Sequence, residues 1–393
     1  MNILYIKGGQ AVEEAVRLFP RKGMLIDGGP DQYLLAVLNQ LGQDRLRLVT
    51  FGERDVHCGN EELGAAEYPL RPLGVGRLKR RLAFCTAAFS FLVDTLKFKP
   101  QRVLCGLDGP IALVALFAAR LCGAEFVFFG HNAIESVSRA YRLSNAIVCR
   151  LADKVVVHGP FVRDEALKLG TTPDKLIEYN NGISETQLHL ISRFPEKRND
   201  ASNDTGTKTL LYVGRIEEDK GALDLLNAFL RMPDRHRLEL HYIGTGSAVP
   251  ALLTKIEQLG LLGMDGQVRL LGALEHDAVF AHMHRATAVV TPSQSRFPEG
   301  RCKTAMEAFY VGTPVVAPDY GPFPYLVEDG INGLLYPADD VDALAEALQR
   351  IVNRPELAAR LEQGARHSGQ RLMQPELPFH QALRQVFRTD APA

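Results

Sequence analysis

The chain has 393 residues, of which 46% are hydrophobic and 23% charged, and its formal net charge is −1. The length suggests two or three domains, and the composition is typical of a soluble globular protein. The near-zero charge provides no general attraction for nucleic acid, so we expect no nucleic-acid partner. The cysteines show no paired short spacing and lie mostly in apolar contexts, which favours a reducing, cytoplasmic environment. No apolar run is long enough to span a bilayer, and the first residues do not resemble a signal peptide.

The first half of the chain alternates strand-like and helix-like segments. Apolar runs that predict buried strands occupy residues 2–6, 46–51, 103–107, 126–129 and 154–158. Segments with helical periodicity separate most of these runs. Strands that alternate with helices at this rhythm predict a parallel sheet covered by helices.

One predicted helix of the first half combines basic and apolar residues. Residues 76–97 have the pattern of a long amphipathic helix that begins with Arg77, Lys79, Arg80 and Arg81. These cations alternate with Leu78 and Leu82 and are followed by Phe84 and Phe89. Such a helix could contact an anionic membrane surface from the cytoplasmic side. A solvated helix end is the simpler interpretation, and both remain open.

Two further features of the first half could serve binding or catalysis. His131 follows the predicted strand 126–129 directly, after a glycine, although a single histidine at a strand end is often structural. The glycine pairs Gly8-Gly9 and Gly28-Gly29 could let the backbone approach a ligand closely. A helix and a strand follow Gly28-Gly29 at suitable distances, so we prefer that pair, with a plain tight turn as the alternative.

The second half begins after a polar segment, residues 184–208, which predicts an exposed connection. The strand 210–213 leads to Arg215 and Lys220, two cations that could converge on a phosphate or pair with the acids between them. The next strand ends in Gly244-Thr245-Gly246. Val249 replaces the third glycine of a dinucleotide fingerprint, so that motif is weak. A further strand, 268–272, contains Leu271.

After the apolar strand 288–290, the sequence pattern predicts a loop, a helix and a strand, in that order, over residues 291–317. The loop would lie at the carboxyl end of a parallel strand, where open α/β sheets bind ligands. Glu299 precedes the helix and Glu307 lies within it. The amides at the helix start could hold an anion while the two carboxylates accept hydrogen bonds from hydroxyls. Favourable placement near a helix dipole, or ordinary surface exposure, is the alternative.

This stretch resembles the Glu-x7-Glu signature of the family 4 retaining glycosyltransferases, which have the GT-B fold. The matching residues are Ser293, Glu299, Gly300, Glu307, Ala308 and the run Gly-Thr-Pro-Val-Val at 312–316. The string YVGRIEEDKG resembles the family element whose Arg and Lys hold the donor diphosphate. The chain departs from the family pattern at Arg301 and Cys302, where Phe-Gly is usual.

The resemblance implies specific roles. Arg215 and Lys220 would neutralise the diphosphate, Glu299 would hold sugar hydroxyls, Glu307 would hold the ribose, and His131 would approach the transferred sugar. Donor contacts would also come from Gly28, Gly29, Gly244, Gly246, Leu271, Gly300, Arg301, Cys302, Lys303 and Thr304. No metal or other cofactor is expected, because the two cations would neutralise the diphosphate.

We therefore expect two Rossmann-like domains with parallel sheets that face an interdomain cleft. Residues 1–183 would bind the acceptor, 184–208 would form a linker, 209–370 would bind the donor, and 371–393 would be a helical tail on the first domain. The expected reaction is transfer of a hexosyl group from a nucleotide diphosphosugar to a hydroxyl of a glycan, lipid-linked or small-molecule acceptor, as in polysaccharide biosynthesis. A nucleotide-sugar epimerase of the same fold and a non-catalytic nucleotide-sugar-binding scaffold are the alternatives.

Overall fold

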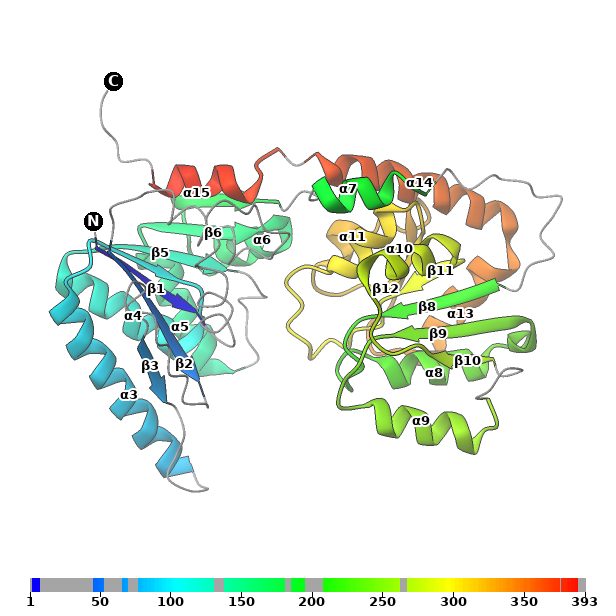
Figure 1. The fold of residues 1–393 in the computed structure, drawn as a ribbon, viewed down its shortest axis with the longest axis horizontal. Helices are drawn as coiled ribbons and strands as arrows, with labels where there is room; N and C mark the ends of the chain where they lie inside the picture. The colour runs from blue at the N-terminus through cyan, green and yellow to red at the C-terminus, as the bar shows by residue number, and fades with distance from the viewer. Residues whose placement is uncertain are drawn as a thin grey trace. The chain divides into compact units, whose positions relative to one another are not determined.

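The computed structural model describes residues 2–7, 45–52, 66–69, 77–130, 138–180, 185–194, 208–261, 267–374 and 376–387. The chain divides into two compact units (Figure 1). Unit 1 comprises residues 1–181 and 376–393, and unit 2 comprises residues 182–375. Across the described helices, none is both long and apolar enough to cross a membrane.

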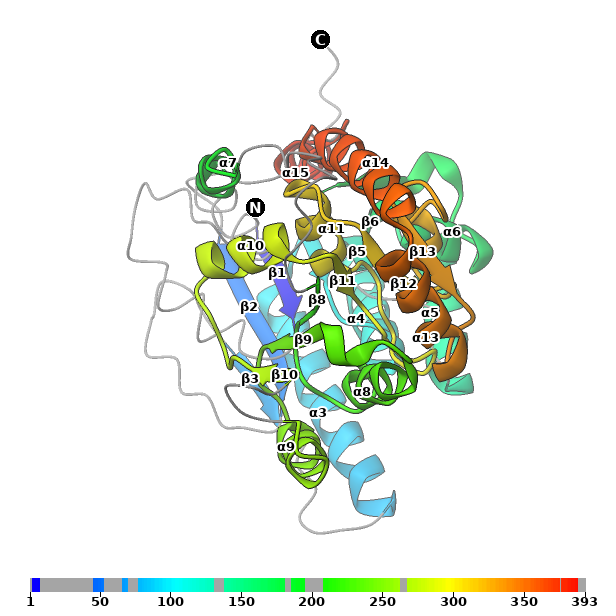
Figure 2. The same cartoon turned by 90° about the vertical axis from the view of Figure 1, so that its right-hand side faces the viewer.

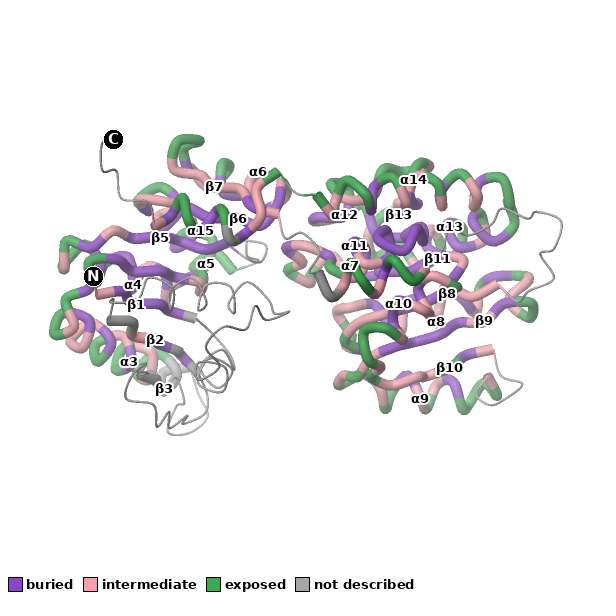
Figure 3. Tube along the Cα trace, turned by 45° about the horizontal axis from the view of Figure 1, so that its top comes forward, coloured by how far each residue is buried: buried purple, intermediate pink, exposed green. Residues whose placement is uncertain are grey.

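Unit 1 is built on a seven-stranded parallel sheet in the order β3-β2-β1-β4-β5-β6-β7. The strands are β1 (Asn2–Lys7), β2 (Arg45–Gly52), β3 (Ala66–Pro69), β4 (Arg102–Cys105), β5 (Glu125–Gly130), β6 (Lys154–His158) and β7 (Leu176–Tyr179). The central strands are buried along nearly their whole length (Figure 3). This burial explains their continuous apolar sequences, because helices cover both faces of a parallel sheet.

The described helices of unit 1 are α3 (Arg77–Phe98), α4 (Gly109–Cys122), α5 (Arg139–Leu151), α6 (Gly159–Lys168), the 3-10 turn η1 (Pro173–Lys175) and α15 (Phe379–Phe387). One apolar cluster joins α3, α4, α5 and α6 to the sheet. A second cluster joins α15 to the other side of the strands, through Phe379, Leu383 and Val386. The long helix expected at residues 76–97 is therefore present, shifted by one residue at each end.

Unit 2 contains a six-stranded parallel sheet in the order β10-β9-β8-β11-β12-β13. Its strands are β8 (Lys208–Val213), β9 (Leu238–Ile243), β10 (Val268–Leu270), β11 (Ala288–Val290), β12 (Val315–Pro318) and β13 (Gly333–Tyr336). The chain adds strands outward from β8 in one direction and then returns to add β11 on its other side. This reversal between β8 and β11 is the switch point at which open α/β sheets place ligands.

The helices of unit 2 form two layers. They are α7 (Glu185–Ile191), α8 (Ala222–Arg231), the 3-10 turn η2 (Arg235–Arg237), α9 (Val249–Gln258), α10 (His276–Arg285), α11 (Lys303–Tyr310), α12 (Phe323–Leu326), α13 (Val341–Asn353) and α14 (Pro355–Met373). Figure 2 shows α8 and α13 on one side of the strands and α10 and α11 on the other. A separate buried apolar cluster fills each side of the sheet.

Part of the expected linker is folded. Residues 185–191 form α7, and Ile191 is buried in the cluster beside α10 and α11. The ring of Phe194 lies 5.3 Å from that of His284 in α10. The mainly polar composition of residues 184–208 did not predict this contact. The apolar residues that anchor the helix lie only in the first part of this segment.

Candidate active site

The loops that follow β8 and β11 contact each other at the switch point of unit 2. Gly221 has a φ of +71°, and a Cβ atom there would lie 1.8 Å from the carbonyl oxygen of Pro292. The amide of Gln294 also donates a hydrogen bond of 2.9 Å to the carbonyl oxygen of Asp219. Only glycine permits this approach without a steric clash. The loop that carries Lys220 is therefore fixed against the loop that carries Glu299.

Lys220 and Glu299 form an ion pair across these two loops. The Lys220 Nζ lies 2.5 Å from Glu299 Oε2, and the two side chains are 19% and 11% exposed. The Lys220 ammonium also lies 3.8 Å from the centroid of the Phe297 ring. Partial exclusion of water strengthens electrostatic interactions at such a position. A cation and a hydrogen-bond acceptor are thus held together at the carboxyl end of the sheet.

Arg215 lies beside the same aromatic ring. Its guanidinium carbon is 5.9 Å from the Phe297 centroid, and its Nη1 lies 3.0 Å from Glu217 Oε2. The side chain is 61% exposed, so it is accessible to a solvent-borne anion. Its backbone is held in place because the Tyr212 hydroxyl donates a hydrogen bond of 2.5 Å to the Arg215 carbonyl oxygen. Two cations therefore flank one ring, which sequence reasoning did not identify.

The start of α11 lies next to this ion pair in the chain. Cys302 is the N-cap residue without a side-chain capping bond, and the first turn of α11 contains no acidic residue. Helix-start amides without intrahelical partners, together with the helix dipole, favour an anion. Thr304 Oγ1 donates a 3.2 Å hydrogen bond to the Val213 carbonyl oxygen, which ties the first turn to β8. Gly300 is buried and Lys303 is exposed.

Cys302 and Arg301, two of the residues expected to contact the donor, both have local contacts beside the start of α11. Burial, and secondarily the nearby Glu299 carboxylate, raise the pKa of the Cys302 thiol to about 12, so the thiol stays neutral. Arg301 Nε lies 2.9 Å from the Met306 sulfur, which directs its side chain along α11. Arg301 and Cys302 thus place a helix-bound guanidinium and a buried thiol beside Gly300.

Glu307 lies in the second turn of α11 and has a partner that sequence reasoning did not identify. Its Oε1 is 3.1 Å from His276 Nε2, at the first residue of α10. Glu307 is 14% exposed, whereas His276 is 54% exposed and stacks on Phe280 at 5.4 Å. No sequence signal pairs these residues, because the strand β11 separates their helices in the chain.

Gly244 and Gly246 allow two strand-end loops to pack closely. A Cβ atom on Gly244 would lie 1.9 Å from the Gly214 carbonyl oxygen, and one on Gly246 would lie 2.2 Å from that of Ile216. The Ile216 amide donates a 2.8 Å hydrogen bond to the Thr245 carbonyl oxygen between them. This loop contact requires a glycine at both positions. The amide of Leu271 donates to the Tyr242 carbonyl oxygen at 2.8 Å, so it is occupied within the sheet.

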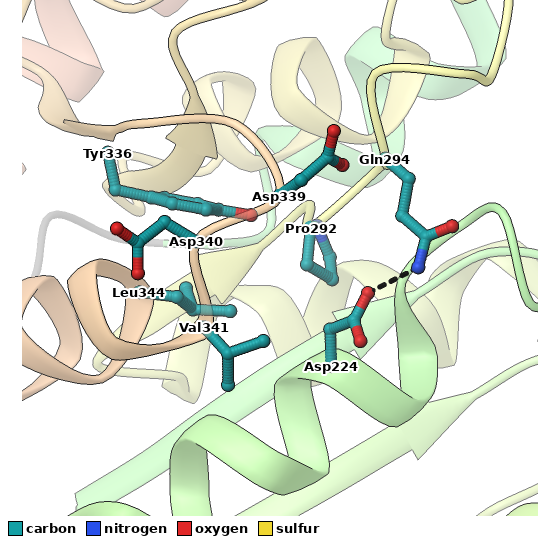
Figure 4. A pocket seen from close by; sticks show the side chains of 8 residues that line it. All are labelled: Asp224, Pro292, Gln294, Tyr336, Asp339, Asp340, Val341 and Leu344. Atoms are coloured by element: carbon teal, nitrogen blue, oxygen red, sulfur yellow. Dashed lines mark hydrogen bonds between the residues drawn. The ribbon is translucent and has the colours of Figure 1, made fainter.

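A pocket opens where α8 and α13 begin, and Figure 4 shows the side chains that line it. Its three carboxylates already serve the fold. Asp224 accepts a 2.5 Å hydrogen bond from Gln294 Nε2, Asp339 accepts a 3.0 Å bond from the Ser295 amide, and Asp340 caps α13 through the Ala343 amide at 2.9 Å. The remaining lining residues are Pro292, Tyr336, Val341 and Leu344. We assign no ligand to this pocket.

Several expected site residues lie outside the described part of the chain. These are His131, both residues of the pair Gly28-Gly29, and the competing pair Gly8-Gly9. In the parts of both units that the structure describes, no group of three or more His, Cys, Asp or Glu residues is arranged to hold a metal ion.

Sequence comparison identifies the family to which part of this chain is similar. Residues 193–368 match the family model described as "Glycosyl transferases group 1". A glycogen synthase from Mycobacterium tuberculosis is 29% identical over 233 residues, which cover 59% of this chain and 53% of the relative. A D-inositol 3-phosphate glycosyltransferase from Saccharomonospora viridis is 30% identical over 228 residues, covering 56% and 52%. The chain spans about half the length of the curated relatives it matches.

Solved structures match along almost the entire chain. HepE from Anabaena, in complex with UDP, has a TM-score of 0.64 at 17% identity, covering 98% of both chains. Sucrose-phosphate synthase from Thermosynechococcus elongatus has a TM-score of 0.65 at 18% identity, covering 99% of this chain and 98% of that one. The protein therefore has the GT-B glycosyltransferase fold, and the expected pair of parallel-sheet α/β domains is confirmed. Within it, residues 193–368 are the part that is similar to the group 1 glycosyltransferases.

Proposed function

We propose that the protein is a retaining glycosyltransferase of the family 4 type. It would transfer a hexosyl group from a nucleoside diphosphate sugar to a hydroxyl of a glycan, lipid-linked or small-molecule acceptor. The observation that carries this proposal is the contact between Lys220 and Glu299 at the switch point of unit 2, beside Arg215 and the start of α11. The group 1 glycosyltransferase match over the same region supports it.

Charge neutralisation is the central chemical task of this site. When the bond between the sugar and the diphosphate breaks, its electron pair leaves with the diphosphate oxygen. Lys220, Arg215 and the amides at the start of α11 would stabilise that negative charge, as fixed donors do in an oxyanion hole. The acceptor oxygen forms its bond to the sugar on the face from which the diphosphate departs, and its proton goes to the departing phosphate oxygen. No protein nucleophile and no metal ion are assigned.

The two glutamates would orient the donor. Glu299 would accept hydrogen bonds from sugar hydroxyls, while its contact with Lys220 keeps the carboxylate in place. Glu307 would accept hydrogen bonds from ribose hydroxyls, which requires His276 to share or release the carboxylate. His276 is more than half exposed, so solvent can hydrate its ring when the ring leaves the carboxylate and its stacking contact with Phe280. The proposed contact of His131 with the transferred sugar rests on the family resemblance alone.

A donor screen with site variants tests the proposal. The protein is incubated with UDP-, GDP- and ADP-sugars, and thermal stability, sugar release and transfer are measured. UDP-glucose is the first candidate, because HepE binds it on the same fold. A true donor stabilises the folded protein, and Lys220→Ala should lower turnover by about a hundredfold, the usual loss when one charge-stabilising group is removed.

Arg296→Ala is the matched control. Arg296 lies on the same loop as Phe297 and forms an exposed ion pair with Glu218, so its removal should leave turnover near the wild-type value. Wild-type turnover in Lys220→Ala would contradict the proposed role of this cation. A rearranged sugar on an intact nucleotide would instead identify an epimerase. Failure to bind any nucleotide sugar would contradict a donor site altogether.

Chelation tests the absence of a metal requirement. We expect EDTA to leave transfer unchanged, because the protein cations replace a metal at the diphosphate. Activity that disappears with EDTA and returns with Mg²⁺ or Mn²⁺ would contradict this part of the proposal.

A further inference from the structure

Helix α3 of unit 1 has two apolar faces. Its inner face is buried against the sheet through Ala87 and Phe91, which are 4% and 1% exposed. Leu82, Phe89 and Leu96 lie on its outer side and are 67%, 67% and 40% exposed. These three residues repeat every seven positions, so they follow one line along the helix. A helix that covers only a sheet needs a single apolar face.

The neighbouring helix α4 also carries exposed apolar side chains. α3 packs beside α4, and the Cys122 thiol lies 3.8 Å from the carbonyl oxygen of Thr95 in α3. Phe117 and Leu121 of α4 are 56% and 52% exposed. We call these five exposed side chains the outer apolar patch: Leu82, Phe89, Leu96, Phe117 and Leu121. Exposed apolar surface, when it is extensive, marks a contact with another molecule or a membrane.

Basic residues occupy the start of the same helix. Arg77, Lys79, Arg80 and Arg81 lie in its first turns, and the first turn contains no acidic residue. The positive end of the helix dipole disfavours cations there, so this arrangement does not serve helix stability. Arg81 is exposed; the side chains of the other three are outside the described set. A helix that starts with four cations and continues with exposed apolar side chains complements a surface that is both anionic and apolar.

We propose that the outer apolar patch docks on the surface of an anionic lipid bilayer, with α3 lying along it. Leu82, Phe89 and Leu96 would enter the boundary between headgroups and acyl chains, while the cations at the helix start bind lipid phosphates. A second copy of the chain is a poorer occupant. α3 contains five basic residues and one acidic residue, Asp94. Two copies that associated through α3 would therefore bring like charges together. This proposal does not depend on the transferase reaction.

Vesicle binding by the full chain is the test. We expect co-sedimentation with vesicles of phosphatidylcholine and phosphatidylglycerol, little with phosphatidylcholine alone, and weakening by salt. The triple variant Leu82→Ser, Phe89→Ser and Leu96→Ser should bind about tenfold more weakly, because it removes most of the inserted apolar surface. The control changes exposed apolar residues of unit 2 with comparable exposure: Leu259→Ser, Tyr325→Ser and Ile331→Ser. Thermal unfolding of each variant verifies that it is folded.

The charge contribution has its own variant. Replacing the four cations at the helix start by glutamine should weaken binding about a thousandfold at low salt, since the attraction of each cation to an anionic surface adds to that of the others. The matched control removes four exposed arginines of unit 2 and should bind like the wild type: Arg285→Gln, Arg350→Gln, Arg354→Gln and Arg360→Gln. An equal loss of vesicle binding in both variants would show that the net charge of the protein governs binding and would contradict a specific role of the cations in α3.

A tryptophan probe reports depth directly, because the chain contains no tryptophan. Phe89→Trp should shift its emission to the blue on vesicle addition and be quenched by brominated acyl chains. Leu259→Trp in unit 2 should show neither effect. Absence of vesicle binding in the wild-type protein, or unchanged binding in the serine triple variant, would overturn the proposal. A concentration-dependent dimer that this triple variant abolishes, without lipid binding, would assign the patch to a second copy instead.

Discussion

The ammonium group of Lys220 is held between the Glu299 carboxylate and the face of the Phe297 ring. Its spacing from Arg215, together with the family resemblance, makes it a candidate from the amino-acid sequence. The ring was not predictable in this way, because a phenylalanine in a polar loop carries no sequence signal for the charge it will contact. Sequence patterns identify charged groups, whereas the uncharged side chain that positions them emerges from packing.

Substitution of Phe297 tests this arrangement. Phe297→Leu keeps an apolar side chain but removes the aromatic face beside Lys220 and Arg215. A cation–π contact at a partly exposed site contributes about 0.5–1 kcal/mol, so we expect kcat/KM for a donor sugar to fall about threefold. Phe297→Tyr keeps the ring and should remain near the wild-type value. Equal kinetics for the leucine and tyrosine variants would show that the ring does not position the cations.

Helix α11 carries much of the proposed site, and its placement depends on α14. A Cβ atom on Gly369 of α14 would lie 2.1 Å from the Phe309 carbonyl oxygen of α11. The two helices pack closely at this point, which the helical periodicity of α14 does not reveal. A glycine inside a helix is usually a cost, so its position here indicates a close contact with another backbone.

Gly369→Ala should therefore destabilise unit 2. Alanine favours an isolated helix by about 1 kcal/mol over glycine, but overpacking against backbone costs about 1–3 kcal/mol, and we expect the clash to prevail. Urea unfolding measures the free-energy difference. Gln370→Ala, at the next and exposed position of α14, is the control and should leave stability nearly unchanged. A Gly369→Ala protein that is as stable as the wild type would contradict the close packing.

At the level of the whole molecule, unit 1 is completed by α15, the last helix that the structure describes. In α15, Phe379 is 4% exposed and Leu383 and Val386 are fully buried against the strands of unit 1. The Lys154 ammonium also donates a 3.2 Å hydrogen bond to the Val386 carbonyl oxygen. Unit 1 thus depends on residues from both ends of the sequence, whereas unit 2 is continuous.

Removal of residues 376–393 should unfold unit 1 selectively. Each large apolar side chain buried by α15 contributes about 1.5–3 kcal/mol, and the sum is comparable to the entire stability of an ordinary domain. Limited proteolysis should then degrade unit 1 and leave a resistant fragment close to residues 182–375. Removal of residues 388–393 alone retains α15 and serves as the control. An intact unit 1 after the longer truncation would contradict the role of this helix.

The sequence by itself determined the alternation of strands and helices, the parallel sheets and the identity of the charged groups at strand ends. These features follow from local periodicity and from residue types that are read along the chain. Only the tertiary structure decided that Lys220 contacts Glu299, that Glu307 pairs with His276, and that Gly244 and Gly246 serve loop packing. Each of these contacts joins segments that are separated by whole elements of the chain, so it depends on the order of strands in the sheet and on how closely backbones pack.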